Sequence, residues 1–204
     1  MYNVIPDFDS YFFWKFKIEN FDSLKEKVET DIESFSNTNK NNVRWNKDCS
    51  VDVINNLNPK EYLQYVEKPL NYIAEELRDH SEYLSSEALG WSERPINKIQ
   101  FDFDSPWINI YNEKSFQEPH SHLPHALAVV MFLNDGKDYG QFYFLNPTVY
   151  PPPWHIMRPQ CIKPTVEAGD IIVFPAYMLH GVTAHHSKEQ RKTMALNVKM
   201  EFNY

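Results

Sequence analysis

The feature that most constrains the fold is a succession of short apolar segments that fills residues 98–204. The last of them, RKTMALNVKMEF, alternates apolar and polar residues, whereas ALAVVMFLND is an almost unbroken apolar run. Alternation is typical of a strand with one buried face, and an unbroken run is typical of a strand buried on both faces. Seven or eight such segments in about a hundred residues predict a mainly β fold of the double-stranded β-helix, or jelly-roll, type.

The first half of the chain has a different character and predicts flanking α-helices with few strands. FFWKFKI, at 12–18, predicts a first strand, and Asp22 predicts the cap of a helix over 23–35. Asn58-Pro59 predicts the start of a second helix, because Asn is a good N-cap and Pro suits the first helical position. Apolar residues then recur at helical spacing as far as Leu77, and Pro69 should bend or split this helix.

These patterns predict one domain, 1–204, in which 1–97 forms a mixed support region and 98–204 forms the jelly-roll core. We expect the second helix to pack on the outside of that core.

The composition excludes several classes of function. Lys plus Arg is 20 and Asp plus Glu is 28, for a net charge of −8, so the chain has no general surface for binding nucleic acid. No apolar run approaches the roughly 20 residues that a membrane span needs, and the N-terminus has no signal-peptide pattern. Cys49 and Cys161 lack metal-site or disulfide spacing, which favours a reduced compartment with two buried thiols. We therefore expect a cytoplasmic protein that binds neither nucleic acid nor membranes.

Residues 118–125 read EPHSHLPH, with three histidines in six positions. Side chains at i and i+2 leave a strand on the same face, so His120 and His122 are expected to converge. Buried imidazoles without partners are costly, and a bound metal removes that cost. His180 is the best candidate for a third ligand, because it follows an apolar strand and seven of the eight histidines lie between 120 and 186.

The remaining histidines are expected to have other roles. His125 is predicted to lie at the surface or to support the ligands. His185 and His186 are predicted to flank a turn in solvent, and His155 to lie on the rim of a proline-rich loop in which Trp154 could cover the pocket.

Arg191 adds a charge to the same side of the predicted barrel. It lies eleven residues after His180, and Arg191 and Thr193 share the face of the last strand opposite Met194, Leu196 and Val198. A buried guanidinium needs an anion, and its fork fits a carboxylate. We therefore expect a small dicarboxylate that reaches from the metal to Arg191 and Thr193.

A His-x-His pair, a distal histidine after a Gly-Asp turn and an Arg-x-Thr soon after it resemble the iron(II)/2-oxoglutarate-dependent oxygenases. The resemblance covers roughly residues 100–204. It is closest to an uncharacterised branch, common in marine bacteria and phages, with a Trp-x-Asn strand such as Trp107-Ile108-Asn109. GQFYFLNP also resembles a glycine-containing strand of prolyl-hydroxylase-like members.

The resemblance implies Fe(II) as cofactor and 2-oxoglutarate and O₂ as cosubstrates. It further implies that Asn109, Tyr111 and Tyr143 bind the cosubstrate together with Arg191 and Thr193. A phage origin would place the activity in the host cytoplasm. The primary substrate, a peptide or a small molecule, and the oligomeric state, monomer or homodimer, stay open.

The sequence departs from the family at one ligand. Most members have His-x-Asp, and this chain has His120-Ser121-His122. In one alignment His122 replaces the carboxylate, which gives three histidine ligands: His120, His122 and His180. In the other, His122 is the usual histidine and Pro124 stands where the carboxylate belongs, which leaves an open position. The first is favoured because His120 and His122 already share a face.

The predicted function is a 2-oxoglutarate-dependent dioxygenase that hydroxylates a C–H bond, with release of succinate and CO₂, on a peptidyl substrate. Two alternatives remain open: a cupin-like three-histidine dioxygenase that uses no 2-oxoglutarate, and an inactive metal-binding module.

Overall fold

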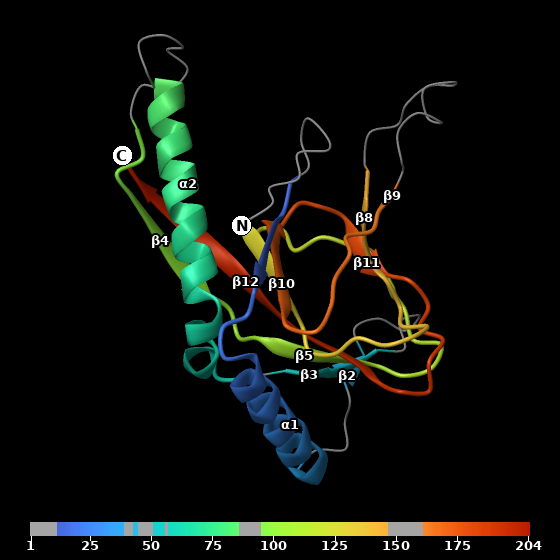
Figure 1. The fold of residues 1–204 in the computed structure, drawn as a ribbon. Helices are drawn as coiled ribbons and strands as arrows, with labels where there is room; N and C mark the ends of the chain where they lie inside the picture. Colours follow the sequence, from blue (N-terminus) through green and yellow to red (C-terminus); the bar gives the residue numbers. More distant parts are fainter. Residues whose placement is uncertain (1–11, 39–42, 45–50, 56, 86–94, 147–160) are drawn as a thin grey trace, which may run out of the picture.

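The computed structural model describes residues 12–38, 43–44, 51–55, 57–85, 95–146 and 161–204. Its strands form two antiparallel sheets that face each other (Figure 1). The large sheet has the order β1-β10-β7-β12-β5-β3-β2, with β4 also paired to β12, and the small sheet has the order β6-β11-β8-β9. This arrangement is the predicted jelly roll.

The large sheet draws strands from both halves of the chain. Its members are β1 (Trp14–Lys17), β2 (Val43–Arg44), β3 (Asp52–Ile54), β4 (Lys98–Phe103), β5 (Trp107–Tyr111), β7 (Leu127–Phe132), β10 (Asp170–Pro175) and β12 (Arg191–Asn203). The small sheet consists of β6 (Gln117–His120), β8 (Phe142–Leu145), β9 (Cys161–Ile162) and β11 (His180–Val182). The first strand predicted at 12–18 is therefore present as β1. It pairs with β10 and is a member of the large sheet, whereas the sequence predicted that this part of the chain supports the core from outside.

Alternating residues of the large sheet belong to two separate apolar layers. On β12, Met194, Leu196 and Val198 pack in the layer that also contains the helices. Ala195 belongs to the second layer, between the sheets, with Phe142 and Phe144 of β8. β7 is buried along its whole length because it contributes to both layers, which confirms the prediction from its unbroken apolar run.

Two α-helices cover the outer face of the large sheet: α1 (Phe21–Thr38) and α2 (Glu67–Ser85) (Figure 1). Leu24 and Val28 of α1, and Leu70 and Ile73 of α2, are buried in the outer apolar layer. The predicted outside position of the second helix is thus confirmed. Among the described residues, no helix combines the length and apolar character needed to cross a membrane.

The second helix starts later than its sequence pattern predicts. Two 3-10 turns, η1 (Pro59–Glu61) and η2 (Leu63–Tyr65), precede α2. Asn58 does act as a cap, because its side-chain oxygen accepts from the Lys60 N–H at 3.2 Å. Pro69 is the third residue of α2, in the first turn, where a missing N–H leaves no helical hydrogen bond unmade, so it does not bend the helix.

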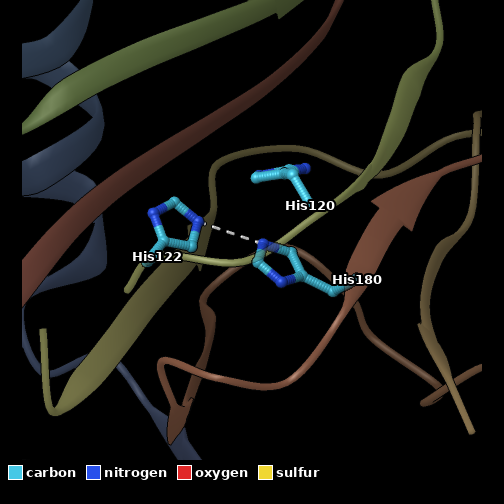
Figure 2. Close-up of side chains that lie close together, drawn as sticks. All are labelled: His120, His122 and His180. Atoms are coloured by element: carbon cyan, nitrogen blue, oxygen red, sulfur yellow. Dashed lines mark hydrogen bonds between the residues drawn. The ribbon is translucent and has the colours of Figure 1, made fainter. Parts of the chain in front are cut away.

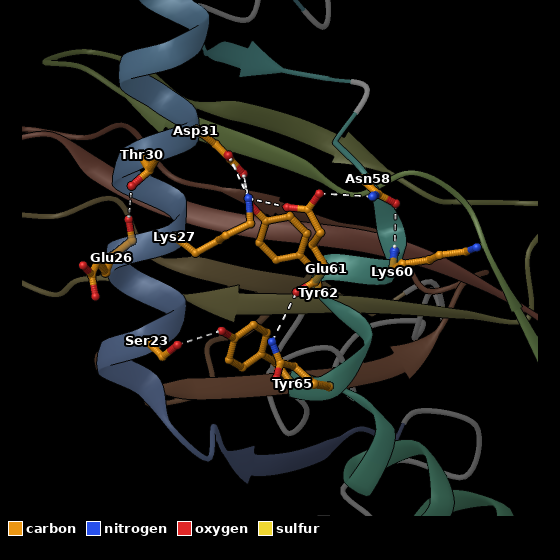
Figure 3. Close-up of polar contacts among 11 residues, drawn as sticks. Ser23, Glu26, Lys27, Thr30, Asp31, Asn58, Lys60, Glu61, Tyr62 and Tyr65 are labelled. Atoms are coloured by element: carbon orange, nitrogen blue, oxygen red, sulfur yellow. Dashed lines mark hydrogen bonds and ion pairs between the residues drawn. The ribbon is translucent and has the colours of Figure 1, made fainter.

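Polar contacts fasten α1 to these 3-10 turns (Figure 3). Lys27 pairs with Asp31 at 2.9 Å and with Glu61 at 2.5 Å. The Tyr62 hydroxyl donates to the Asp31 carboxylate, and the nearby carboxylate and burial raise the pKa of Tyr62. Through these contacts α1 and the turns form one layer over the sheet.

Cys49, and Trp154 and His155 of the proline-rich loop, lie outside the described residues. Cys161 is a free thiol and is half-buried, which is less than the predicted full burial.

Candidate metal centre

His120 and His180 come from neighbouring strands of the small sheet. They are direct partners in the antiparallel β6–β11 pair, and their ring centroids lie 4.3 Å apart. His122 lies just past the end of β6, where its backbone N–H donates to the Ala176 carbonyl at 2.8 Å. The three imidazoles therefore converge, although His120 and His122 do not share one regular strand as predicted (Figure 2).

The nitrogen positions suit a single metal ion. Nε2 of His122 lies 3.1 Å from Nε2 of His180, and one ligand atom from each of the three histidines lies within 4.8 Å of the others. Two ligands at right angles, each about 2.1 Å from an ion, are about 3.0 Å apart. His122 and His180 already have this spacing, and His120 offers a third nitrogen within 4.8 Å of theirs.

Backbone carbonyls fix the orientation of two of these rings. Nδ1 of His120 lies 2.8 Å from the Glu118 carbonyl, and Nδ1 of His180 lies 3.0 Å from the Met178 carbonyl. A carbonyl only accepts, so each Nδ1 is the protonated nitrogen and each Nε2 keeps its lone pair. Such partners are typical of metal-bound histidines.

Burial keeps the cluster neutral. It lowers the pKa of His120, lowers that of His180 well below its usual value, and lowers that of His122 to about 3, with neighbouring histidines adding to the shift. Neutral imidazoles are the form that binds metals, so protons do not compete strongly at pH 7.

The second part of the site lies on the facing strands of the large sheet. Arg191 pairs with Tyr111, and Thr193 pairs with Asn109, across the β12–β5 ladder. The Asn109 amide donates to the Thr193 hydroxyl at 3.4 Å, and the Tyr111 hydroxyl donates to the Gln117 side chain at 2.8 Å. Arg191 and Thr193 point between the sheets, because they lie on the face of β12 opposite Met194 and Leu196, and their partners Tyr111 and Asn109 on β5 line the same space.

One hollow brings the two parts together. It has a volume of about 20 Å³ and is lined by Trp107, Asn109, Tyr111, Gln117, His120, His122, Val130, Phe142, His180, Val182, Arg191, Thr193 and Ala195. This volume holds about one water molecule, so lining side chains must rotate to admit a larger ligand. No carboxylate is among the described residues that line it.

Arg191 shows the strongest signature of a ligand site. Its side chain is only 3% exposed, and its Nη1 and Nη2 atoms have no hydrogen-bond partner among the described residues. Burial lowers the pKa of the guanidinium, and Tyr111 opposes that lowering. The Asn109 side-chain oxygen is also buried without a partner. Buried polar groups are normally satisfied, so the guanidinium nitrogens fit an anionic ligand in the hollow, whereas the Asn109 oxygen fits a hydrogen-bond donor.

The lining residues that the sequence did not predict include Trp107 and Gln117. Trp107 stacks on the His122 ring, with centroids 5.7 Å apart. Gln117 lies three residues before His120, a spacing that normally places side chains on opposite faces of a strand. The pairing of β11 with β6 shifts register between His180 and Val182, and this irregularity turns both residues toward the hollow. No local sequence signal marks the shift.

Tyr143 is not brought into this hollow. Phe142 and Phe144 are the inward residues of β8, and Tyr143 lines a separate surface depression with Phe116 and Cys161. Tyr143 was expected to contact the cosubstrate, but the alternation of side chains along β8 turns Tyr143 outward.

The other described histidines lie outside the hollow. His186 is exposed, as predicted. The prediction for His185 is wrong, because its side chain is fully buried: Nδ1 accepts from the Gly140 N–H at 3.2 Å and Nε2 donates to the Glu189 carbonyl at 2.7 Å. His125 is half-buried beside the Asp104 carboxylate.

Comparison with protein families gives a match over residues 105–197, to a family described as "Putative 2OG-Fe(II) oxygenase". The match spans the hollow from Trp107 to Thr193. Residues 105–197 are therefore similar in sequence to the 2OG-Fe(II) oxygenases. Among curated proteins, a sequence comparison finds no match.

Solved structures of 2OG-Fe(II) oxygenases share the fold. A prolyl-4-hydroxylase from Pseudomonas putida is 12% identical, with a TM-score of 0.58 and 96% of each chain covered. HygX from Streptomyces hygroscopicus, solved with nickel, 2-oxoglutarate and hygromycin B, is 10% identical, with a TM-score of 0.60 and 94% of this chain and 84% of HygX covered. The epimerase SnoN of nogalamycin biosynthesis is 12% identical, with a TM-score of 0.56 and 94% and 81% covered.

The residues present fit the cofactors of a 2OG-Fe(II) oxygenase. Three neutral imidazoles offer nitrogen ligands to Fe(II), and an unpaired buried guanidinium offers a fork to a carboxylate of 2-oxoglutarate.

Proposed function

We propose that this 2OG-Fe(II) oxygenase is a hydroxylase in which His120, His122 and His180 hold the metal and Arg191 and Thr193 hold the distal carboxylate of 2-oxoglutarate. The observation that carries the proposal is that the three imidazoles and the unpaired guanidinium line the same hollow. Fe(II), bound with 2-oxoglutarate and O₂, would supply the oxidising chemistry that hydroxylates an unactivated C–H bond with release of succinate and CO₂.

The chain's own residues bind, orient and exclude water. Arg191 would hold the carboxylate through its guanidinium fork, and the aromatic rings of Tyr111 and Phe132, 4.6 and 5.7 Å from the guanidinium carbon, keep the guanidinium in place. Thr193 and Asn109 add a hydroxyl and an amide beside the same carboxylate. Val130 and Phe142 line the hollow with apolar surface, which strengthens the charged contacts by excluding water.

Three histidine ligands are favoured over the alignment that places Pro124 at the metal. Pro124 is exposed and does not line the hollow, whereas His122 is buried there. With three neutral ligands the centre is more positive by one unit than with a carboxylate ligand, and a dianionic cosubstrate compensates for that charge.

The two alternative functions make different demands on the site. A cupin-like dioxygenase without 2-oxoglutarate has no use for an unpaired buried guanidinium, so Arg191 favours the 2-oxoglutarate enzyme. The observation that supports an inactive module is that His122 stands where most of the family has a carboxylate ligand.

We propose a peptidyl side chain as the primary substrate. The support is the similarity to the prolyl-4-hydroxylase, which covers 96% of both chains, whereas the antibiotic-modifying HygX and SnoN are covered to 84% and 81%. We also propose that the protein acts in the cytoplasm.

Succinate formation from 2-oxoglutarate, measured with Fe(II), O₂ and a peptide library, tests the function. Wild-type protein and an Arg78→Met control, which removes an exposed arginine of α2, should form succinate, and Arg191→Met should not. Succinate formation by Arg191→Met equal to that of wild type would show that Arg191 does not bind the cosubstrate. Substrate oxidation that does not require 2-oxoglutarate would favour the cupin-like alternative, and absence of turnover with bound Fe(II) and 2-oxoglutarate would favour the inactive module.

A further inference from the structure

The third histidine of EPHSHLPH has no place in the proposed metal set, yet it contacts one of its members. Nδ1 of His125 lies 2.8 Å from the backbone carbonyl oxygen of His122, and Nε2 of His125 lies 2.5 Å from a carboxylate oxygen of Asp104. His125 therefore bridges the segment that carries His122 and the segment between β4 and β5.

His122 needs such support because no strand holds it. β6 ends at His120, and β7 begins at Leu127, so His122 lies in a connection without ladder hydrogen bonds of its own. Its N–H donates to Ala176, and its carbonyl accepts from the His125 N–H at 3.1 Å as well as from the His125 ring. The His122 N–H contact reaches the segment after β10, and the His125 ring carries a second contact from the connection to Asp104.

Hydrogen-bond chemistry sets the direction of the contact between His125 and His122. The His122 carbonyl only accepts, so Nδ1 donates. The other oxygen of Asp104 accepts from Lys199 at 3.0 Å, and Lys199, followed by His125, lowers the pKa of this carboxyl. The Asp104 carboxylate therefore joins the His125 ring to Lys199.

Asp104 links this unit to the strand that carries the cosubstrate site. Its backbone N–H donates to the Asn197 carbonyl of β12 at 3.2 Å, and its carboxylate pairs with Lys199 of β12. The middle of β12 thus contacts Asp104, and the beginning of the same strand carries Arg191 and Thr193.

We propose that His125 and Asp104 are positioning residues, which hold His122 at the metal by fixing its backbone carbonyl. The proposal rests on the proposed function, since it assumes that His122 is a ligand. Residues that orient metal ligands typically contribute about 10–100-fold to metal affinity.

The test measures Co(II) affinity and the Co(II) visible absorption spectrum of the full chain. His125→Phe should lower the affinity about 10-fold or more and change the spectrum. His125→Asn should recover most of both, because the Asn amide can place an N–H where Nδ1 stands. Asp104→Asn, which keeps an acceptor and loses the charge, should fall between them. His186→Phe, at an exposed histidine, is the matched control and should bind as wild type.

The outcomes separate the two hypotheses. If wild-type protein binds no Co(II), the proposed function fails. If wild type binds and His125→Phe binds equally well with the same spectrum, the positioning role is overturned and the metal site stands. Should His125→Phe not fold, Asp104→Asn decides, because its half-exposed side chain can be changed without opening the core. An unchanged affinity and spectrum in Asp104→Asn would then reject the role.

Discussion

Arg191 and Tyr111 are cross-strand partners in β12 and β5, and the guanidinium carbon lies 4.6 Å from the centre of the tyrosine ring. The ring holds the cation from one side, and Nη1 and Nη2 have no hydrogen-bond partner among the described residues. A buried guanidinium without an anionic partner opposes folding, and it is stabilised when an anion binds. Removal of the Arg191 charge is therefore expected to weaken ligand binding without lowering the stability of the ligand-free protein.

Arg191→Met should weaken 2-oxoglutarate binding by at least about 100-fold, because a buried charge-assisted pair is lost. The same substitution should leave the free energy of unfolding of the ligand-free protein unchanged or raise it by about 1 kcal/mol, since no partner is left behind and a desolvated charge is removed. Calorimetric binding and urea unfolding measure the two effects. A large loss of stability with unchanged binding would show that Arg191 is structural.

His122→Asp should keep metal binding, and His122→Ala should weaken it about 10–100-fold. Aspartate supplies the carboxylate that most of the family has, and its charge offsets that of the metal, whereas alanine leaves two ligands. Competition with a chelator measures both affinities. If both variants bind metal as tightly as wild type, His122 is not a ligand.

Acid should destabilise the metal-free protein through the histidine cluster. The pKa of His122 is lowered to about 3 in the folded protein, and that of an unfolded histidine is about 6.5. Above pH 6.5 the ring is neutral in both states; below it the unfolded state takes up a proton first, so stability falls as the pH drops from 6.5 toward 3. The loss at pH 5 should be on the order of 2 kcal/mol.

Comparison with His122→Gln isolates this contribution from the protonation of carboxylates. The variant should lose less stability than wild type between pH 7 and pH 5, as measured by urea unfolding. Parallel pH profiles would mean that His122 titrates normally in the folded protein.

Gly181→Ala should destabilise the β6–β11 pair that carries His120 and His180. A Cβ at Gly181 would lie 2.6 Å from the Gln117 carbonyl oxygen, which is backbone and cannot rotate away, so the expected loss is about 2 kcal/mol or more. A Cβ at Gly136 would lie 2.6 Å from the Tyr139 ring, which can shift. Gly136→Ala should therefore cost about 1 kcal/mol or less in thermal or urea unfolding. Equal effects would contradict the close packing at Gly181.

Local sequence patterns correctly predicted which side chains lie on each face of a strand where apolar and polar residues alternate. The last strand has Met194 and Leu196 on the helix side and Arg191 and Thr193 on the other, as its sequence indicates. The convergence of His120 and His122 was predicted from their spacing on one strand. The structure brings them together in another way, because His122 lies past the end of β6 and its N–H donates to the Ala176 carbonyl.

Long-range contacts decided the features that the sequence did not predict. Gln117 reaches the hollow through a register shift between β6 and β11, and His185 is buried because Gly140 and Glu189 supply its hydrogen bonds from outside its turn. Tyr143 could have been assigned to the outer face, since Phe142 and Phe144 on either side of it are the more apolar pair.

A crystal structure of the protein grown without oxygen, with Fe(II) and 2-oxoglutarate, tests the account most directly. We expect electron density for one ion bonded to nitrogen atoms of His120, His122 and His180, and for a diacid whose far carboxylate contacts the Arg191 guanidinium. An ion held by other residues, or a diacid that leaves Arg191 without contact, would contradict the account.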